Sequence, residues 1–178
     1  MADAVVFGNL MISLLKHADR VTSASLAQLV NVIAPIMTEP DGPAWRQTTF
    51  FPFAITSRLA KGSVLELKLD AGTYESAEYG VVPLVDAVAT HDDAAGTAAV
   101  FLVNRSQTEE ITVTIDIAAL DGFTGVSAES LYDTDVYAKN TLEEPERVTM
   151  KPNTTATLDG GAVTVTLPPV SWTAVALA

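Results

Sequence analysis

The side chains best suited to chemistry lie in one run of the sequence, from Leu26 to Phe53. In this run an apolar stretch leads through the turn sequence TEPDGPA at 38–44 to Trp45, Arg46 and Gln47, and an aromatic segment follows. The combination is too specific for a generic core element. It also lies where the sequence changes from helical to strand-rich patterning. We therefore treat it as the candidate site.

The acidic residues do not suggest a catalytic pair. Glu39 and Asp41 belong to the polar turn at 38–44, where a solvated loop side chain is the default interpretation. Glu143, Glu144 and Glu146 form a charge run that is typical of a solvated loop. The sequence shows no second acid that would share a water-free pocket with Glu39 or Asp41. We therefore expect no acid–base pair within these 178 residues.

Composition excludes several classes of site and partner. There is no cysteine, which rules out disulfides, cysteine-type zinc sites and thiol nucleophiles. With His17 and His91 as the only histidines, a multi-histidine metal site is not expected, and we predict neither metal nor cofactor. The net charge of −12 argues against nucleic-acid and anionic-membrane partners, because phosphate binding needs clustered Lys and Arg.

The beginning of the sequence carries no recognisable export signal or membrane span. Asp3 precedes the first apolar residues and no positively charged segment stands before them. No apolar run reaches the roughly 20 residues that a bilayer requires. We therefore expect a soluble, cytoplasmic protein.

The elements that must position the candidate site are predicted to form an α-β-α unit. Apolar residues from Phe7 to Ala18 recur at helical spacing, with Asp3 near the start of the helix and basic residues near its end. The continuous apolar run Val21–Pro35 predicts a strand buried on both faces, as in a parallel sheet. Trp45–Leu59 predicts a helix interrupted by Pro52. In α/β barrels, the loops after the strands carry the site.

From Lys61 onward the apolar period changes to two, which predicts an antiparallel β-sandwich or jelly roll. We place the domain boundary near residues 60–62, giving 1–60 as one part and 61–178 as the other. Strands are expected at the five runs 64–69, 99–103, 111–117, 163–167 and 171–177, with turns at 71–72, 95–96, 121–122 and 159–161. Trp172 in the final run is expected in the sandwich core.

The first 60 residues cannot close an α/β domain by themselves. A single buried parallel strand leaves both of its edges without hydrogen-bond partners, and a full barrel needs about 200 residues or more. We favour the interpretation that the chain begins inside a larger α/β domain. The alternative is that these helices pack directly on the sandwich as an accessory layer.

Several long motifs resemble one known family. HADRV at 17–21, LAQLVNVIAPIMTE at 26–39 and PAWRQTTFFPF at 43–53 are similar to the C-terminal portion of glycoside hydrolase family 51 α-L-arabinofuranosidases. AKNT at 138–141, EPERV at 144–148 and the closing LPPVSWTAVAL at 167–177 extend the resemblance over nearly the whole chain.

The resemblance implies a retaining, exo-acting glycosidase with a (β/α)8 barrel followed by a jelly-roll-like β-sandwich. This chain would supply the last α-β-α elements of the barrel and most of the sandwich. Both catalytic glutamates would lie upstream of Met1, so the chain alone is expected to be inactive. In the family the sandwich also recruits the N-terminal segment of the enzyme, so its sheet is expected to lack a strand here.

The resemblance also assigns one residue to substrate. A glutamine in this WRQ motif lines the arabinofuranose pocket, and an amide can both donate to and accept from sugar hydroxyls, which makes Gln47 the predicted binding residue. The alternative is that Gln47 caps its own helix. Trp45, Arg46 and Asn31 are weaker candidates: packing for Trp45, an ion pair for Arg46 and local backbone bonding for Asn31 are the competing interpretations.

Two further functional classes stay open beside the enzyme. The expected partner is an arabinofuranosyl-containing oligosaccharide or polysaccharide such as arabinan or arabinoxylan, and the family's assemblies imply a homo-oligomer. The alternative is a non-catalytic carbohydrate-binding module or a structural, oligomerising sandwich. A sugar-binding sandwich usually exposes several aromatics on one face, whereas here the tyrosines are scattered, at 74, 79, 132 and 137.

Overall fold

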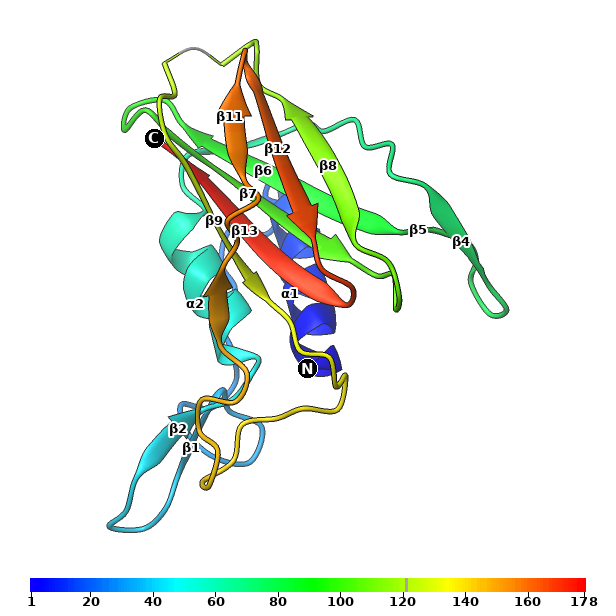
Figure 1. Ribbon diagram of the computed structural model, residues 1–178. Coiled ribbons are helices and arrows are strands. Elements are labelled where there is room, and N and C mark those ends of the chain that lie inside the picture. The colour runs from blue at the N-terminus through cyan, green and yellow to red at the C-terminus, as the bar shows by residue number, and fades with distance from the viewer. Residues whose placement is uncertain (121) are drawn as a thin grey trace.

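The computed structural model describes residues 1–120 and 122–178, and it confirms a mainly β, antiparallel fold (Figure 1). The largest sheet has six strands in the order β10-β9-β13-β7-β6-β3. Every neighbouring pair in it is antiparallel. In chain order its strands are β3 (Ser63–Leu65), β6 (Val85–Asp92), β7 (Thr97–Asn104), β9 (Val126–Leu131), β10 (Met150–Pro152) and β13 (Ser171–Leu177).

A three-stranded sheet in the order β11-β12-β8 covers one face of the large sheet. Its strands are β8 (Ile111–Asp116), β11 (Thr157–Asp159) and β12 (Ala162–Leu167). Side chains from the two sheets meet in a common core, in which Val100 and Leu102 of β7 pack with Val163 and Val165 of β12. Because side chains alternate along a strand, Phe101 and Val103 of β7 point to the opposite face.

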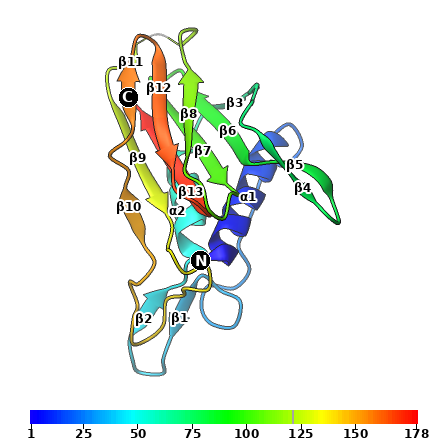
Figure 2. The ribbon, with the colours of Figure 1, turned by 45° about the vertical axis from the view of Figure 1, so that its right-hand side comes forward.

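Helices α1 (Ala2–Lys16) and α2 (Phe50–Leu59) cover that opposite face, as Figures 1 and 2 show. Phe101 and the fully buried Trp172 stack there, with ring centroids 5.9 Å apart. A Cβ on Gly8 of α1 would lie 2.2 Å from Cδ1 of Trp172, so the helix can approach the indole this closely only because residue 8 is glycine. The helices therefore pack directly on this face of the large sheet.

Two short hairpins extend from this body. One pairs β1 (Ile36–Thr38) with β2 (Ala44–Arg46), and the other pairs β4 (Thr73–Ser76) with β5 (Gly80–Pro83). They leave the sandwich at different places in Figure 1. The hairpin β1–β2 carries the residues of the candidate site.

The helix predicted to begin at Trp45 is shorter than expected. Trp45 and Arg46 belong to β2, and α2 runs from Phe50 to Leu59. Pro52 does not interrupt the helix, because it lies in the first turn, where a backbone N–H has no intrahelical acceptor to lose. The predicted first helix is present as α1.

The predicted strand at Val21–Pro35 is wrong. These residues form no helix or strand, and β1 begins only at Ile36. A strand needs a neighbour to pair with, and no strand within residues 1–120 and 122–178 pairs with this segment. Instead Gln28, Asn31 and Val32 adopt positive φ angles, which break any extended run.

The β-rich part agrees well with its period-two pattern. The strands expected near 99–103, 111–117, 163–167 and 171–177 correspond to β7, β8, β12 and β13. The run at 64–69 is only partly a strand, because β3 ends at Leu65. Gly72, Gly96, Gly160 and Gly161 have the positive φ angles of turns, and the turn expected at 121–122 lies partly outside the described residues, which omit 121.

A polar cluster joins α1 to strand β6. Asp86 on β6 accepts hydrogen bonds from Lys16 and from Asn9 Nδ2 (3.0 Å), both on α1, and forms an ion pair with Arg105 (3.1 Å). Burial alone would raise the pKa of Asp86, but the hydrogen bond and charge of Lys16, the Asn9 bond and the charge of Arg105 together lower it. The Asp86 carboxylate therefore stabilises the folded state.

We predict that Asp86→Asn lowers the free energy of unfolding at pH 7 by about 1.5–3 kcal/mol, the usual value for hydrogen bonds to a charged group. Because the folded-state pKa lies below the ordinary value of 3.8, this contribution is complete above about pH 5 and is lost as the pH falls through the folded-state pKa. Urea unfolding of both proteins between pH 7 and pH 3 should show the difference shrinking. Exposed Glu110→Gln is the control, with little change expected at pH 7. A difference that stays constant over this range would contradict the assignment.

Candidate functional site

The hairpin β1–β2 sets the geometry of the candidate site. Its register pairs Ile36 with Arg46 and Met37 with Trp45. The turn closes by two backbone bonds: Glu39 N–H donates to the Pro43 carbonyl (3.1 Å) and Gly42 N–H donates to the Glu39 carbonyl (3.1 Å). The sequence TEPDGPA thus makes the expected turn, and the returning strand delivers residues 45–47 to the base of the hairpin.

Asn31 closes the other end of this loop. Its Oδ1 accepts from the Thr38 N–H (2.7 Å) and its Nδ2 donates to Thr38 Oγ1 (2.9 Å). Its backbone N–H donates to the Ile36 carbonyl (2.8 Å), and its φ of 63° is one that asparagine tolerates. The Asn31 amide is therefore engaged in local bonding and has one N–H left for any other contact.

Gln47 lies directly after β2 and lines a cavity of about 480 Å³. The walls come from the start of α1, from the segment 32–37 and from the loop 136–139. Among the hydrogen bonds of the described residues, none involves the Gln47 side chain, and the N-cap of α2 is Thr49. The Gln47 amide is thus half-buried, faces a cavity and has its donors and acceptor available.

Trp45 and Arg46 line a separate cavity of about 710 Å³, together with Phe50 and residues 144–147. The indole Nε1 of Trp45 is buried and has no hydrogen-bond partner among the described residues. The Arg46 guanidinium lies over the rings of Phe50 (5.6 Å) and Phe51 (5.4 Å) and is 3.7 Å from the Glu146 carboxylate. Packing and an ion pair therefore hold Arg46.

The acids near the hairpin are all exposed. Glu39 and Asp41 stand in the turn, and Glu143, Glu144 and Glu146 lie on the surface of the loop that follows Asn140. Glu144 and Glu146 pair with Arg147 and Arg46 respectively. Within residues 1–120 and 122–178 no group of three potential metal ligands is found. The described part of the chain thus offers a polar binding group but no buried carboxyl pair.

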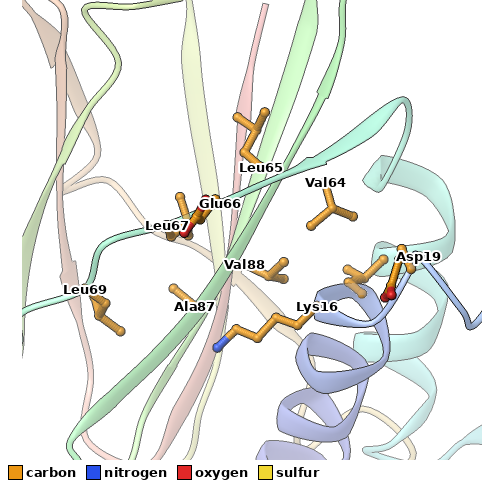
Figure 3. Close-up of a pocket in the computed structure, with 11 residues that line it drawn as sticks. Lys16, Asp19, Val64, Leu65, Glu66, Leu67, Leu69, Ala87 and Val88 are labelled. Carbon is orange, nitrogen blue, oxygen red and sulfur yellow. The ribbon is translucent and has the colours of Figure 1, made fainter.

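A third cavity, of about 570 Å³, lies between the end of α1 and the segment 64–69, which contains the end of β3 (Figure 3). Aliphatic side chains such as Val64, Leu65 and Val88 make up most of its wall. Its lysine, Lys16, is already bonded to Asp86. This cavity is a gap between the helix layer and the sheet, and its lining offers no group of side chains suited to catalysis.

Two features of the site region were not predicted. Leu29, Val32 and Ile33 are strongly exposed, at 79%, 82% and 69%, although the sequence placed them in a buried strand. Asn140, which the sequence singled out only within a motif, donates to the Arg46 carbonyl across 94 residues. No local pattern reveals such a contact, because its two ends are far apart in the chain.

Comparison with known proteins gives a consistent result. Residues 1–171 match a family model described as the α-L-arabinofuranosidase C-terminal domain. The chain is 59% identical over 177 residues to an exo-α-(1→6)-L-arabinofuranosidase of Bifidobacterium longum, covering 98% of this chain and 34% of the relative. It is 50% identical over 173 residues to an intracellular exo-α-(1→5)-L-arabinofuranosidase of Streptomyces lividans, covering 97% and 26%.

The structural comparison agrees. AbfB, a family 51 α-L-arabinofuranosidase from Bifidobacterium longum, superposes with a TM-score of 0.92 at 48% identity, over 99% of this chain and 35% of that one. A family 51 arabinofuranosidase from Xanthomonas axonopodis pv. citri gives 0.86 at 27% identity, with 99% and 35% covered. The chain thus spans between 26% and 35% of the length of these relatives.

Proposed function

Because the chain belongs to the α-L-arabinofuranosidase C-terminal domain family, we propose that it is the C-terminal part of a retaining, exo-acting α-L-arabinofuranosidase of glycoside hydrolase family 51. The observation that carries this proposal is the 59% identity over 98% of the chain to a relative with that activity. The enzyme would release terminal non-reducing α-L-arabinofuranosyl residues from arabinan, arabinoxylan or their oligosaccharides. Relatives named for (1→5) and for (1→6) linkages are both similar, so the proposal concerns the terminal sugar and not its linkage.

In this proposal the chain contributes to binding and not to bond cleavage. Retaining glycosidases hold two carboxyl groups about 5–5.5 Å apart, one as nucleophile and one as acid and base. The exposed acids of the hairpin, Glu39 and Asp41, are not held in such a pair, so both catalytic carboxyls come from outside the described residues. The Gln47 amide, free and facing a cavity, can accept from one sugar hydroxyl and donate to another.

The chain by itself is therefore expected to release no arabinose from a chromogenic α-L-arabinofuranoside. A chimera in which it replaces the matching third of the Bifidobacterium longum exo-α-(1→6)-L-arabinofuranosidase should hydrolyse that substrate. Rates would be measured for the chain, for the chimera and for the unaltered relative. Hydrolysis by the isolated chain would refute the assignment of both acids to another part of the protein. A folded chimera without activity would refute the functional equivalence of the two segments.

The role of Gln47 is tested in the same chimera. Gln47→Ala should lower kcat/KM by about 10- to 100-fold, because hydrogen bonds to the sugar that strengthen in the transition state are lost. Gln107→Ala, which removes an exposed amide of the sandwich, is the matched control and should leave kcat/KM unchanged. A Gln47→Ala variant with the kinetics of the unsubstituted chimera would remove Gln47 from the site.

We further propose that residues 1–60 complete a (β/α)8 barrel and that residues 61–178 form the attached sandwich. Exposure of Leu29, Val32 and Ile33 supports this division, because the rest of a barrel would cover these apolar side chains.

The open edge of the smaller sheet supports a second contact with the rest of the enzyme. β8 pairs with β12 on one side only, and a groove of about 750 Å³ runs along it, lined also by residues 66–72 and by Leu102. An added strand would satisfy the unpaired backbone groups of β8. We propose that the N-terminal segment of the enzyme occupies this groove.

Ile33→Asp tests the barrel proposal. The side chain is 69% exposed here, so the substitution should leave the melting temperature of the isolated chain within about 1–2 °C of its original value. In the chimera the same aspartate would be buried without a partner, so soluble yield and activity should fall sharply. Val81→Asp, on the equally exposed hairpin β4–β5 (71%), is the control. Equal tolerance of both substitutions in the chimera would contradict burial of the segment.

Relatives named as intracellular enzymes support the proposal that the enzyme acts in the cytoplasm. Among the described residues, no helix is long and apolar enough to cross a membrane. We also propose a homo-oligomeric enzyme, without nucleic-acid or membrane partners.

A further inference from the structure

Asn140 connects the sandwich to the base of the hairpin β1–β2. It is 2% exposed, and its amide is fully used on both sides. Nδ2 donates to the carbonyl oxygens of Arg46 (2.9 Å) and Val148 (2.9 Å), while Oδ1 accepts from the Val148 N–H (2.8 Å). An asparagine bonded in this way has one orientation and cannot rotate without breaking all three bonds.

The acceptor on the hairpin is the carbonyl of the peptide unit that joins Arg46 to Gln47. The N–H of the same peptide unit, on Gln47, donates to the Pro35 carbonyl (2.8 Å). Because a peptide unit is planar, bonds at its carbonyl and at its N–H fix the orientation of the whole plane. They therefore fix the position of the Gln47 Cα, from which the side chain extends.

The support behind Asn140 is itself rigid. Val148 is fully buried and Ala138 is 2% exposed, and both belong to the core formed by the helices and the large sheet. Ala2 N–H of α1 donates to the Val136 carbonyl (2.9 Å) just before this segment. One side chain, that of Asn140, thus links the Arg46–Gln47 peptide to the sandwich core.

We propose that Asn140 is a positioning residue, which aligns the Gln47 amide for the terminal sugar through the Arg46–Gln47 peptide. This inference rests on the proposed function, in that it needs Gln47 to contact the substrate. It gives the sandwich a part in substrate binding through the alignment of Gln47.

The test is a double-mutant cycle in the chimera, with Asn140→Ala, Gln47→Ala and the double variant. Asn140→Ala should lower kcat/KM by about 10-fold when Gln47 is present, since small displacements of a binding group are costly. When residue 47 is already alanine, the same substitution should change kcat/KM by less than about 2-fold, because the group being aligned is gone.

Asn104→Ala is the matched control for lost stability. Asn104 is equally buried, donates from Nδ2 to the carbonyls of Glu109, Leu167 and Pro168 and accepts from the Ser106 N–H, but it lies away from the hairpin. The Asn104→Ala substitution should lower the melting temperature, as Asn140→Ala does. It should leave kcat/KM at the value of the unsubstituted chimera when activity is measured well below the melting temperature.

The outcomes separate the two proposals. If Gln47→Ala lowers kcat/KM and Asn140→Ala does not, or if Asn140→Ala costs the same with either residue at 47, positioning by Asn140 is overturned and the role of Gln47 stands. If Gln47→Ala changes nothing, the site assignment fails and the positioning role fails with it.

A second measurement needs no activity. In the isolated chain, Asn140→Ala should accelerate hydrogen exchange of the Gln47 amide by about 10-fold or more, because the peptide loses one of its two anchors. Asn104→Ala should leave that amide unchanged. Unaltered exchange at Gln47 in Asn140→Ala would overturn the proposal even if the chimera failed to fold.

Discussion

The central six-stranded sheet is apolar on both faces, and the need to cover both faces organises the rest of the molecule. Strand β7 shows this most directly, because its residues from Ala98 to Asn104 are buried without interruption. The three-stranded sheet covers one face and the helices α1 and α2 cover the other. Trp172, stacked on Phe101 and in contact range of Gly8, is where the helix layer and the sheet fit most closely. Removing the helices would expose this core, so helices and sandwich form one packing unit even though the sequence pattern changes between them.

This shared core explains how the site loop obtains a defined position. The loop between α1 and α2 is long and largely irregular, but both of its ends are helices fixed to the sheet. The hairpin β1–β2 within it is braced again from the sandwich, by Asn140 and by the ion pair of Arg46 with Glu146. By contrast, the segment that contains Leu29 and Ile33 has no such support and leaves its apolar side chains in solvent. The polar end of the loop is thus held by the sandwich, whereas its apolar start is exposed.

Much of the sandwich could be predicted from the sequence, and the failures have physical causes. β8 and β12 show the alternation of a strand with one more buried face, whereas β7 and β13 are buried along almost their whole length. β9 was missed because small and polar residues, such as Ala128 and Ser130, occupy its buried positions; Ser130 is instead satisfied by a 2.7 Å bond to Thr173. The run Val21–Pro35 was wrongly predicted as a strand. Its apolar pattern indicates side chains that favour burial, but it does not show whether a neighbouring strand is present to pair with. For the site, residue patterns indicated the segment around Trp45–Gln47, whereas the choice of Gln47 depended on family resemblance.

The contact between Asn140 and Arg46 lies beyond any local pattern, and it shows what the sandwich does for the hairpin β1–β2. A domain that only added surface would need no fully bonded, buried amide directed at the peptide before Gln47. Buried polar side chains are costly unless every bond is made, so a network that satisfies all of them also selects one geometry. Inside the sandwich, Asn104 selects one geometry in this way, because its hydrogen bonds fix the turn after β7. Asn140 does the same between the sandwich and the hairpin. The same chemistry that holds the sandwich together therefore extends to the loop that presents Gln47, and the accuracy of that loop depends on the packing of the sheet behind it.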